Sequence, residues 1–224
     1  MQRMIAVIVT LLSIGILTFA QNEGPIIVNE HDGLEPFTSV IENPEFNEGD
    51  YTLILVNGRI MEIPAGWSFT ANPLIGGLPP YIKRGEEPGL EFLWEWINGQ
   101  AGLAQDGIQL YGNQRYAIQV EYLTDLFYTS DQLPFVPSDF QVYARLYTAS
   151  GGMIELPRIN SEGLEQSHSV EWVIESVNNP YPFVRLEVMF DVEWPQFRGS
   201  VFAQRMDIVT VADDYRPNAV INFE

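Results

Sequence analysis

The sequence has no cysteine, a single lysine (Lys83) and only two histidines among its 224 residues. Without cysteine the chain can form no disulfide framework and has no acceptor thiol for a lipid anchor. The G-x-S-x-G, H-E-x-x-H and EF-hand patterns are also missing, which excludes the serine hydrolases, zinc peptidases and calcium sites that those motifs mark. No N-x-Ser/Thr site occurs either, and this absence favours a bacterial exported protein.

Positive charge is scarce as well, because 11 basic residues stand against 30 acidic ones, for a net charge of −19. Such a chain repels phosphate backbones, and its arginines after residue 20 are spread from Arg59 to Arg216, so we predict no nucleic-acid partner. Acidic residues can pair in a glycosidase, and sequence alone does not reveal spatial pairs. Because the two histidines, His31 and His168, belong to no catalytic motif, we predict that the protein is not an enzyme.

The first twenty residues have the layout of a secretory signal peptide. Arg3 precedes an apolar run from Met4 to Phe19, and the small residue Ala20 precedes a polar stretch. We predict cleavage after Ala20 and a secreted or extracytoplasmic mature chain that does not insert into a membrane. A retained N-terminal anchor is the alternative, because the apolar run is long for a cleaved signal.

The remaining chain is predicted to contain one folded domain. We place the signal peptide at residues 1–20, a turn-rich spacer at 21–36, the domain at 37–212 and a polar tail at 213–224. No internal repeat or shift in composition divides the domain.

Apolar and polar residues alternate with period two through the domain, and no segment has a sustained helical period. The pattern is clearest in residues 116–122, 139–148 and 183–192. Weaker strands are predicted at residues 51–56, 58–63, 91–97, 169–177 and 199–211. About eight to ten strands predict an all-β fold, a two-sheet antiparallel β-sandwich.

Three short segments of the domain follow the pattern of one known family. The first is IENPEFNEGDY (residues 41–51) with IPAGW ending at Trp67, the second is residues 102–122, and the third is VFAQRMDIVTV near the end. Together they resemble secreted carbohydrate-binding modules of the galactose-binding-like jelly-roll type. The residues that carry the resemblance are Asn43, Phe46, Gly49, Pro64, Gly66, Trp67, Gly102, Gln105, Gly112, Tyr116 and Asp207.

This resemblance implies a jelly roll with a structural calcium ion between its first and last strands. Asp207 matches the aspartate of the closing strand, whereas Asn47 stands where the family has a glutamate. Glu45 or Glu48 could replace that glutamate. We therefore predict Glu45 and Asp207 as calcium ligands.

The polar face of segment 139–148 is the predicted ligand site, with Gln141, Tyr143, Arg145 and Tyr147 in a row. Its two tyrosines lie about 13 Å apart at strand rise. Aromatic rings contact the apolar faces of sugars, and planar polar groups fix their hydroxyls. The alternative is an ordinary solvent-facing strand. The segment from Leu74 to Pro88 could cover this face.

The sequence thus predicts an exported, non-catalytic module that binds a glycan or cell-surface polysaccharide through a polar and aromatic sheet face. Trp94, Trp96 and Trp172 are predicted to be buried rather than to form a sugar platform. The alternative is a structural or adhesive cell-envelope protein that makes protein contacts. That alternative predicts an apolar surface patch or self-association.

Overall fold

The computed structural model describes residues 38–56, 58–73, 80–95, 99–110, 114–128, 140–161, 166–175, 183–193 and 197–216. The predicted signal peptide and spacer lie outside the described residues. Within the described residues there is no helix that is long and apolar enough to cross a membrane.

The described residues form thirteen strands, more than the eight to ten predicted from the sequence. They are β1 (Thr52–Val56), β2 (Arg59–Ile63), β3 (Ser68–Pro73), β4 (Tyr81–Arg84), β5 (Leu90–Glu95), β6 (Gly99–Leu110), β7 (Arg115–Tyr128), β8 (Phe140–Thr148), β9 (Met153–Glu155), β10 (Ile159–Asn160), β11 (Gln166–Glu175), β12 (Phe183–Val192) and β13 (Phe197–Val211).

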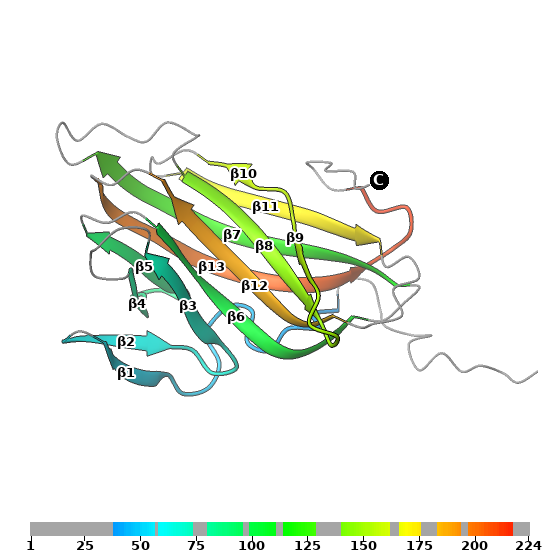
Figure 1. The fold of residues 1–224 in the computed structure, drawn as a ribbon, viewed down its shortest axis with the longest axis horizontal. Coiled ribbons are helices and arrows are strands. Elements are labelled where there is room, and N and C mark those ends of the chain that lie inside the picture. The colour runs from blue at the N-terminus through cyan, green and yellow to red at the C-terminus, as the bar shows by residue number, and fades with distance from the viewer. Residues whose placement is uncertain are drawn as a thin grey trace, which may run out of the picture. The chain divides into compact units, whose positions relative to one another are not determined.

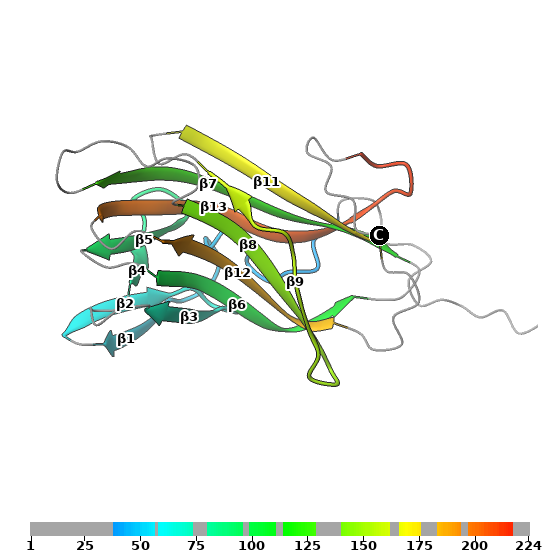
Figure 2. The ribbon, with the colours of Figure 1, turned by 45° about the horizontal axis from the view of Figure 1, so that its top comes forward.

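Two layers of antiparallel strands face each other (Figures 1 and 2). One, here called the β8 sheet, has the order β10-β8-β12-β6-β3 with β9 also paired to β8, and the other, the β13 sheet, has the order β11-β7-β13-β5-β4. Strands β1 and β2 form a separate hairpin. From β5 to β8 and from β10 to β13 the chain changes sheet at each step, which confirms the predicted two-sheet antiparallel sandwich of jelly-roll type.

The core lies between the two sheets because the long strands of both sheets turn an apolar set inward. Phe190 of the β8 sheet packs edge-on against Phe92 and Tyr122 of the β13 sheet, with ring centroids 5.0 and 5.5 Å apart. Trp94 and Trp172 are fully buried, as predicted. Trp96 lies outside the described residues.

The strongest period-two segments correspond closely to strands. β12 covers the predicted residues 183–192, β8 starts one residue late at Phe140, and β7 runs on to Tyr128. Strands β3, β4, β6, β9 and β10 are not among the strands predicted from alternation. β6 begins with small residues, GQAGLAQ, whose alternation is weak, and β4, β9 and β10 are too short to show a period.

The family-like motif at residues 41–51 forms a compact turn that is held by hydrogen bonds. Asn43 has a left-handed backbone (φ 52°), and its side chain bonds the backbone N–H and carbonyl of Glu48 at 2.8 and 3.0 Å. The Trp67 indole N–H donates to the Asn43 carbonyl at 3.0 Å, and the Trp67 ring contacts buried Phe46. The motif therefore has a structural role: it holds the first described segment against the sandwich.

Candidate functional site

The four predicted ligand residues of β8 lie on the outer face of the β8 sheet, but they are not equally accessible. Gln141, Arg145 and Tyr147 are half-buried, whereas Tyr143 is 0 % exposed. The guanidinium groups of Arg145 and Arg158 lie 5.0 and 4.2 Å from the Tyr143 ring centroid. The ring face that the sequence analysis assigned to a sugar is covered by these two side chains.

The cover comes from residues 153–160, which run along the edge of β8 opposite β12 and are called the edge strap below. β9 and β10 pair with β8, and the Leu156 N–H donates to the Ala144 carbonyl at 2.8 Å (Figure 1). Within the expected covering segment from Leu74 to Pro88, residues 74–79 lie outside the described part. Its described residues 81–84 form β4, which belongs to the opposite sheet.

An ionic network joins the edge strap to β8 and β12. Arg158 pairs with Asp191 at 2.6 Å and with Glu155 at 3.0 Å, and Arg145 bonds Glu155 at 2.9 Å. The Tyr147 hydroxyl donates to Glu187, a buried carboxylate, at 2.6 Å. The polar groups of the predicted site thus bind one another, which leaves them less available to a ligand.

A second arrangement concerns the predicted calcium ligands. Asp207 is 0 % exposed, and its carboxylate accepts from the Ser39 hydroxyl at 2.5 Å and from the Arg205 guanidinium at 2.6 Å. The Arg205 guanidinium therefore supplies the positive charge next to Asp207, where the predicted calcium ion would lie. The hydrogen bond to Asp207 raises the pKa of Arg205 most, and the nearby carboxylates of Glu121 and Glu45 add to this effect.

A calcium ion does not fit this arrangement. Both carboxylate oxygens of Asp207 are engaged, and Glu45 accepts a hydrogen bond from Asn47 at 3.1 Å. The described residues contain no group of three or more acidic or histidine side chains able to hold a metal ion, whereas calcium takes 6 to 8 oxygen ligands. The calcium ion stays a prediction from the resemblance, and the geometry does not support it.

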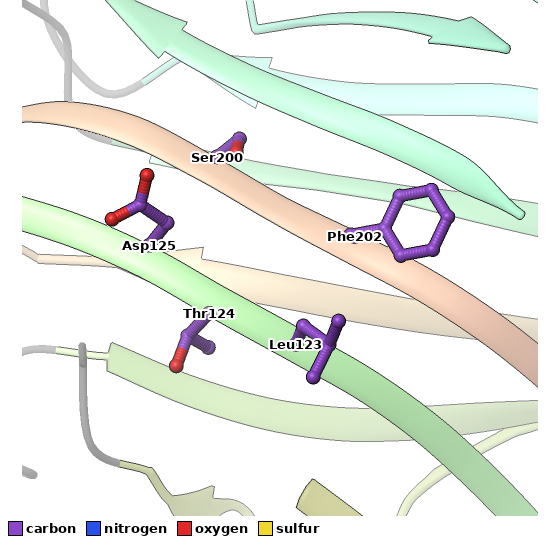
Figure 3. Close-up of a pocket in the computed structure, with 5 residues that line it drawn as sticks. All are labelled: Leu123, Thr124, Asp125, Ser200 and Phe202. Carbon is purple, nitrogen blue, oxygen red and sulfur yellow. The ribbon is translucent and has the colours of Figure 1, made fainter. Parts of the chain in front are cut away.

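The outer face of the β13 sheet carries an open pocket of about 320 Å³, here called the Phe202 pocket (Figure 3). Its lining residues are Leu123, Thr124, Asp125, Ser200 and Phe202. Strand register brings them together, because Asp125 is paired with Ser200 and Leu123 with Phe202 across β7 and β13. Asp125 and Leu123 are exposed, whereas Thr124, which alternates with them, is buried.

Glycines fix the walls of this pocket. A Cβ at Gly85 or Gly89 would lie 2.3 or 2.5 Å from the Phe202 ring, so the turn between β4 and β5 packs directly against that ring. At Gly199 a Cβ would lie 2.0 Å from the Asp125 carbonyl oxygen. The close approach of β13 to β7 therefore depends on Gly199 and sets the position of Asp125.

Beyond the pocket, a row of exposed and half-buried side chains crosses the same face of the sheet. Ser200 is paired with Leu93 on β5, and Leu93 with Tyr81 on β4. The Arg59 guanidinium stacks 4.6 Å from the Tyr81 ring centroid and bonds Glu95. From Asp125 to Tyr81 the row crosses three strand spacings, about 14 Å. We call the four residues Asp125, Ser200, Leu93 and Tyr81 the Asp125 row.

The Phe202 pocket was not predictable from local sequence, because its lining residues come from two strands, β7 and β13, that are distant in the chain. The only local signal is the alternation of Leu123 and Asp125 in the extension of β7. A bulge between Ala203 and Arg205 also interrupts the alternation of side chains along β13. Phe202 and Asp207 therefore lie on the same face of the strand although they are an odd number of positions apart.

No family model matches the chain, and no curated protein matches it in sequence. Among solved structures it is similar to TmCBM61 in complex with beta-1,4-galactotriose, with a TM-score of 0.46, 10% identity and coverage of 76% of this chain and 97% of that one. It is also similar to CBM28, a non-crystalline cellulose specific carbohydrate-binding module (TM-score 0.45, 13% identity, 80% of this chain and 97% of that one).

A third similar structure is a Stig cyclase, Fisc from Fischerella sp. TAU, with a TM-score of 0.43, 13% identity and coverage of 79% of this chain and 98% of that one. The carbohydrate-binding modules that the sequence motif resembles are thus among the similar structures. At TM-scores below 0.5 these likenesses say nothing of the ligand of this chain, which has to be argued from its own surface.

Proposed function

We propose that the protein is an exported, non-catalytic module that binds carbohydrate at the Phe202 pocket. The observation that carries this proposal is the union, in one open pocket, of an aromatic ring, a carboxylate and a hydroxyl from adjacent strands (Figure 3). These groups stand on two long paired strands, so the site is built on rigid elements.

Four of the five lining residues have a place in sugar recognition. The Phe202 ring and Leu123 offer apolar surface to the C–H face of a pyranose. The Asp125 carboxylate accepts hydrogen bonds from sugar hydroxyls, and such charge-assisted bonds are the strong ones. The Ser200 hydroxyl both donates and accepts. Together they would fix the orientation of one ring.

The Asp125 row points to an oligosaccharide rather than a monosaccharide. It extends the polar and aromatic surface by about 14 Å across the strands and ends at Tyr81. The carboxylate of Asp125 and the net charge of −19 disfavour anionic sugars. We therefore expect a neutral oligosaccharide, held across β7, β13, β5 and β4.

Titration calorimetry against neutral oligosaccharides of increasing length tests the proposal. Asp125→Asn keeps the shape of the side chain but removes its charge, and it should weaken binding about 10-fold or more, because hydrogen bonds to charged groups contribute about 1.5–3 kcal/mol. The matched control is Asp106→Asn, an exposed aspartate on the opposite sheet, which should bind as the wild type does.

Two outcomes would reject this site. If Asp106→Asn and Asp125→Asn reduce affinity equally, the pocket has no special role. If Tyr147→Phe, which removes the hydrogen bond to Glu187 on the β8 sheet, reduces affinity while Asp125→Asn does not, the ligand binds the face first predicted from the sequence.

A second candidate function, a structural or adhesive protein of the cell envelope, is favoured by one observation. Leu53, Leu55 and Ile60 on the β1–β2 hairpin are more than 60 % exposed, an apolar patch of the kind that marks contacts between proteins. Loss of an adhesive or self-association activity on Leu55→Lys, with sugar binding unchanged, would distinguish the two functions.

A further inference from the structure

The β1–β2 hairpin exposes more large apolar side chains than any other described element. Leu53 is 65 % exposed, Leu55 72 % and Ile60 61 %, and Ile54 on the other face of β1 is 40 % exposed. Large apolar residues so exposed are costly to hydrate, at about 25 cal/mol for each Å². Their clustering on one hairpin indicates a surface that another chain covers.

The hairpin is held firmly in place. Met61 and Ile63 of β2 are buried in the core, and the Glu62 carboxylate accepts from the backbone N–H of Arg84 on β4 at 2.7 Å. Its outermost strand, β1, pairs with β2, and no other described strand pairs with it. One edge of β1 is therefore available as a template for a further strand.

We propose that two copies of this chain associate through antiparallel pairing of β1 with β1. A two-fold axis at Ile54 places Leu53 of one copy opposite Leu55 of the other, and Thr52 opposite Val56. The strand is thus complementary to itself, and the exposed leucines of both copies fall on one face of a four-stranded sheet, β2-β1-β1-β2.

The distribution of charge favours a second copy of this chain as the partner of β1. Two molecules of net charge −19 repel each other over most of their surfaces, but β1, TLILV, carries no charge. Antiparallel pairing also brings the acidic approach to β1, with exposed Glu48 and Asp50, beside the turn of the other hairpin, where Arg59, which also pairs with Glu95, begins β2. Opposite charges therefore flank an apolar centre.

The contact is small, because it comprises a five-residue strand and three apolar side chains from each copy. Interfaces below about 1,200 Å² are mostly weak or transient. We therefore expect a concentration-dependent dimer, which sedimentation velocity would reveal between about 1 μM and about 500 μM.

Leu55→Lys should abolish this dimer, because a lysine on an edge strand opposes pairing. Ile154→Lys is the matched control: Ile154 is a 47 % exposed apolar residue on another short edge strand, β9, and this variant should still dimerise. A wild-type protein that stays monomeric at the highest concentration overturns the proposal. So does a dimer that Ile154→Lys removes and Leu55→Lys leaves intact.

The absence of cysteine allows a direct test of the register. Paired residues on antiparallel strands have Cβ atoms about 4.5–5.5 Å apart, so Ile54→Cys on the two-fold axis should form a disulfide-linked dimer on mild oxidation. Ile154→Cys should remain monomeric. Equal cross-linking of the two variants would contradict the proposed pairing. Wild-type protein that floats with neutral phosphatidylcholine vesicles while staying monomeric would assign the patch to a lipid surface and also overturn it.

Discussion

Tyr143 is the residue whose surroundings differ most from those that its position in the sequence indicates. It alternates with apolar residues as a surface tyrosine does, yet it is fully buried under two arginines. Its hydroxyl has no hydrogen-bond partner among the described residues. Burial raises the pKa of Tyr143 to about 12.

Tyr143→Phe should therefore leave the free energy of unfolding at pH 7 unchanged or raise it by about 1 kcal/mol, since no hydrogen bond is lost. In the wild type the unfolded state loses the Tyr143 proton from about pH 10, whereas the folded state keeps it to about 12, so stability falls over this range. The variant should lose less stability between pH 10 and 12, as measured by urea unfolding.

Tyr122→Phe is the comparison, because the pKa of Tyr122 is also raised to about 12 by burial but its hydroxyl donates to Ser161 at 2.9 Å. That variant should be less stable than wild type at pH 7 by about 1 kcal/mol. Equal stability losses in the two variants at pH 7 would show that Tyr143 has a partner.

At the scale of elements, the edge strap depends on charge. Burial acts to raise the pKa of Glu155, but hydrogen bonds from Arg145 and Arg158 outweigh burial and lower it below its ordinary value. A lowered pKa contributes stability that is present above the ordinary value of about 4.5 and is lost as the pH falls through the folded-state value. We therefore expect the edge strap to be held less firmly in acid than at neutral pH.

Glu155→Gln should release the strap without acid. We expect faster hydrogen exchange at pH 7 of the Leu156 amide, which donates to Ala144, while amides of β12 stay protected. Glu95→Gln, which removes an exposed ion pair with Arg59 elsewhere, is the control and should leave Leu156 protected. Unchanged protection in Glu155→Gln would show that backbone pairing alone holds the strap.

For the whole molecule, hydrogen bonds to β13 join the first described segment to the last strand. β5 pairs with β13 only as far as Ala203, and beyond it the backbone of residues 38–44 bonds β13. Ser39 adds its hydroxyl to the buried Asp207 carboxylate. The first described segment is thus fastened to β13 by hydrogen bonds, and Arg205 of the same strand balances the charge of the buried Asp207.

Arg205→Met should lower the free energy of unfolding by about 3–5 kcal/mol, because it leaves a buried carboxylate without its charge partner. Adding Asp207→Asn should restore part of the loss. For the wild type we expect the same Tm in calcium and in EDTA. A Tm that falls in EDTA would instead support the calcium ion implied by the family resemblance.

The features that depend on local order were predictable from sequence. The alternation in residues 183–192 defines β12 and its buried set, since side chains of a strand point to alternate faces. Burial of Trp94 and Trp172 followed from the apolar residues around them. Residue composition likewise identified a domain that does not depend on disulfides.

Accessibility and neighbourhood were decided only by the tertiary structure. Whether Tyr143 contacts solvent depends on Arg158, fifteen positions later, and the pairing of Asp125 with Ser200 depends on the register of β7 and β13. Register is a property of strands that meet in space, and a shift of one residue would move Asp125 to the core side. The sequence by itself determined an all-β sandwich; the register determined which of its faces is open to a ligand.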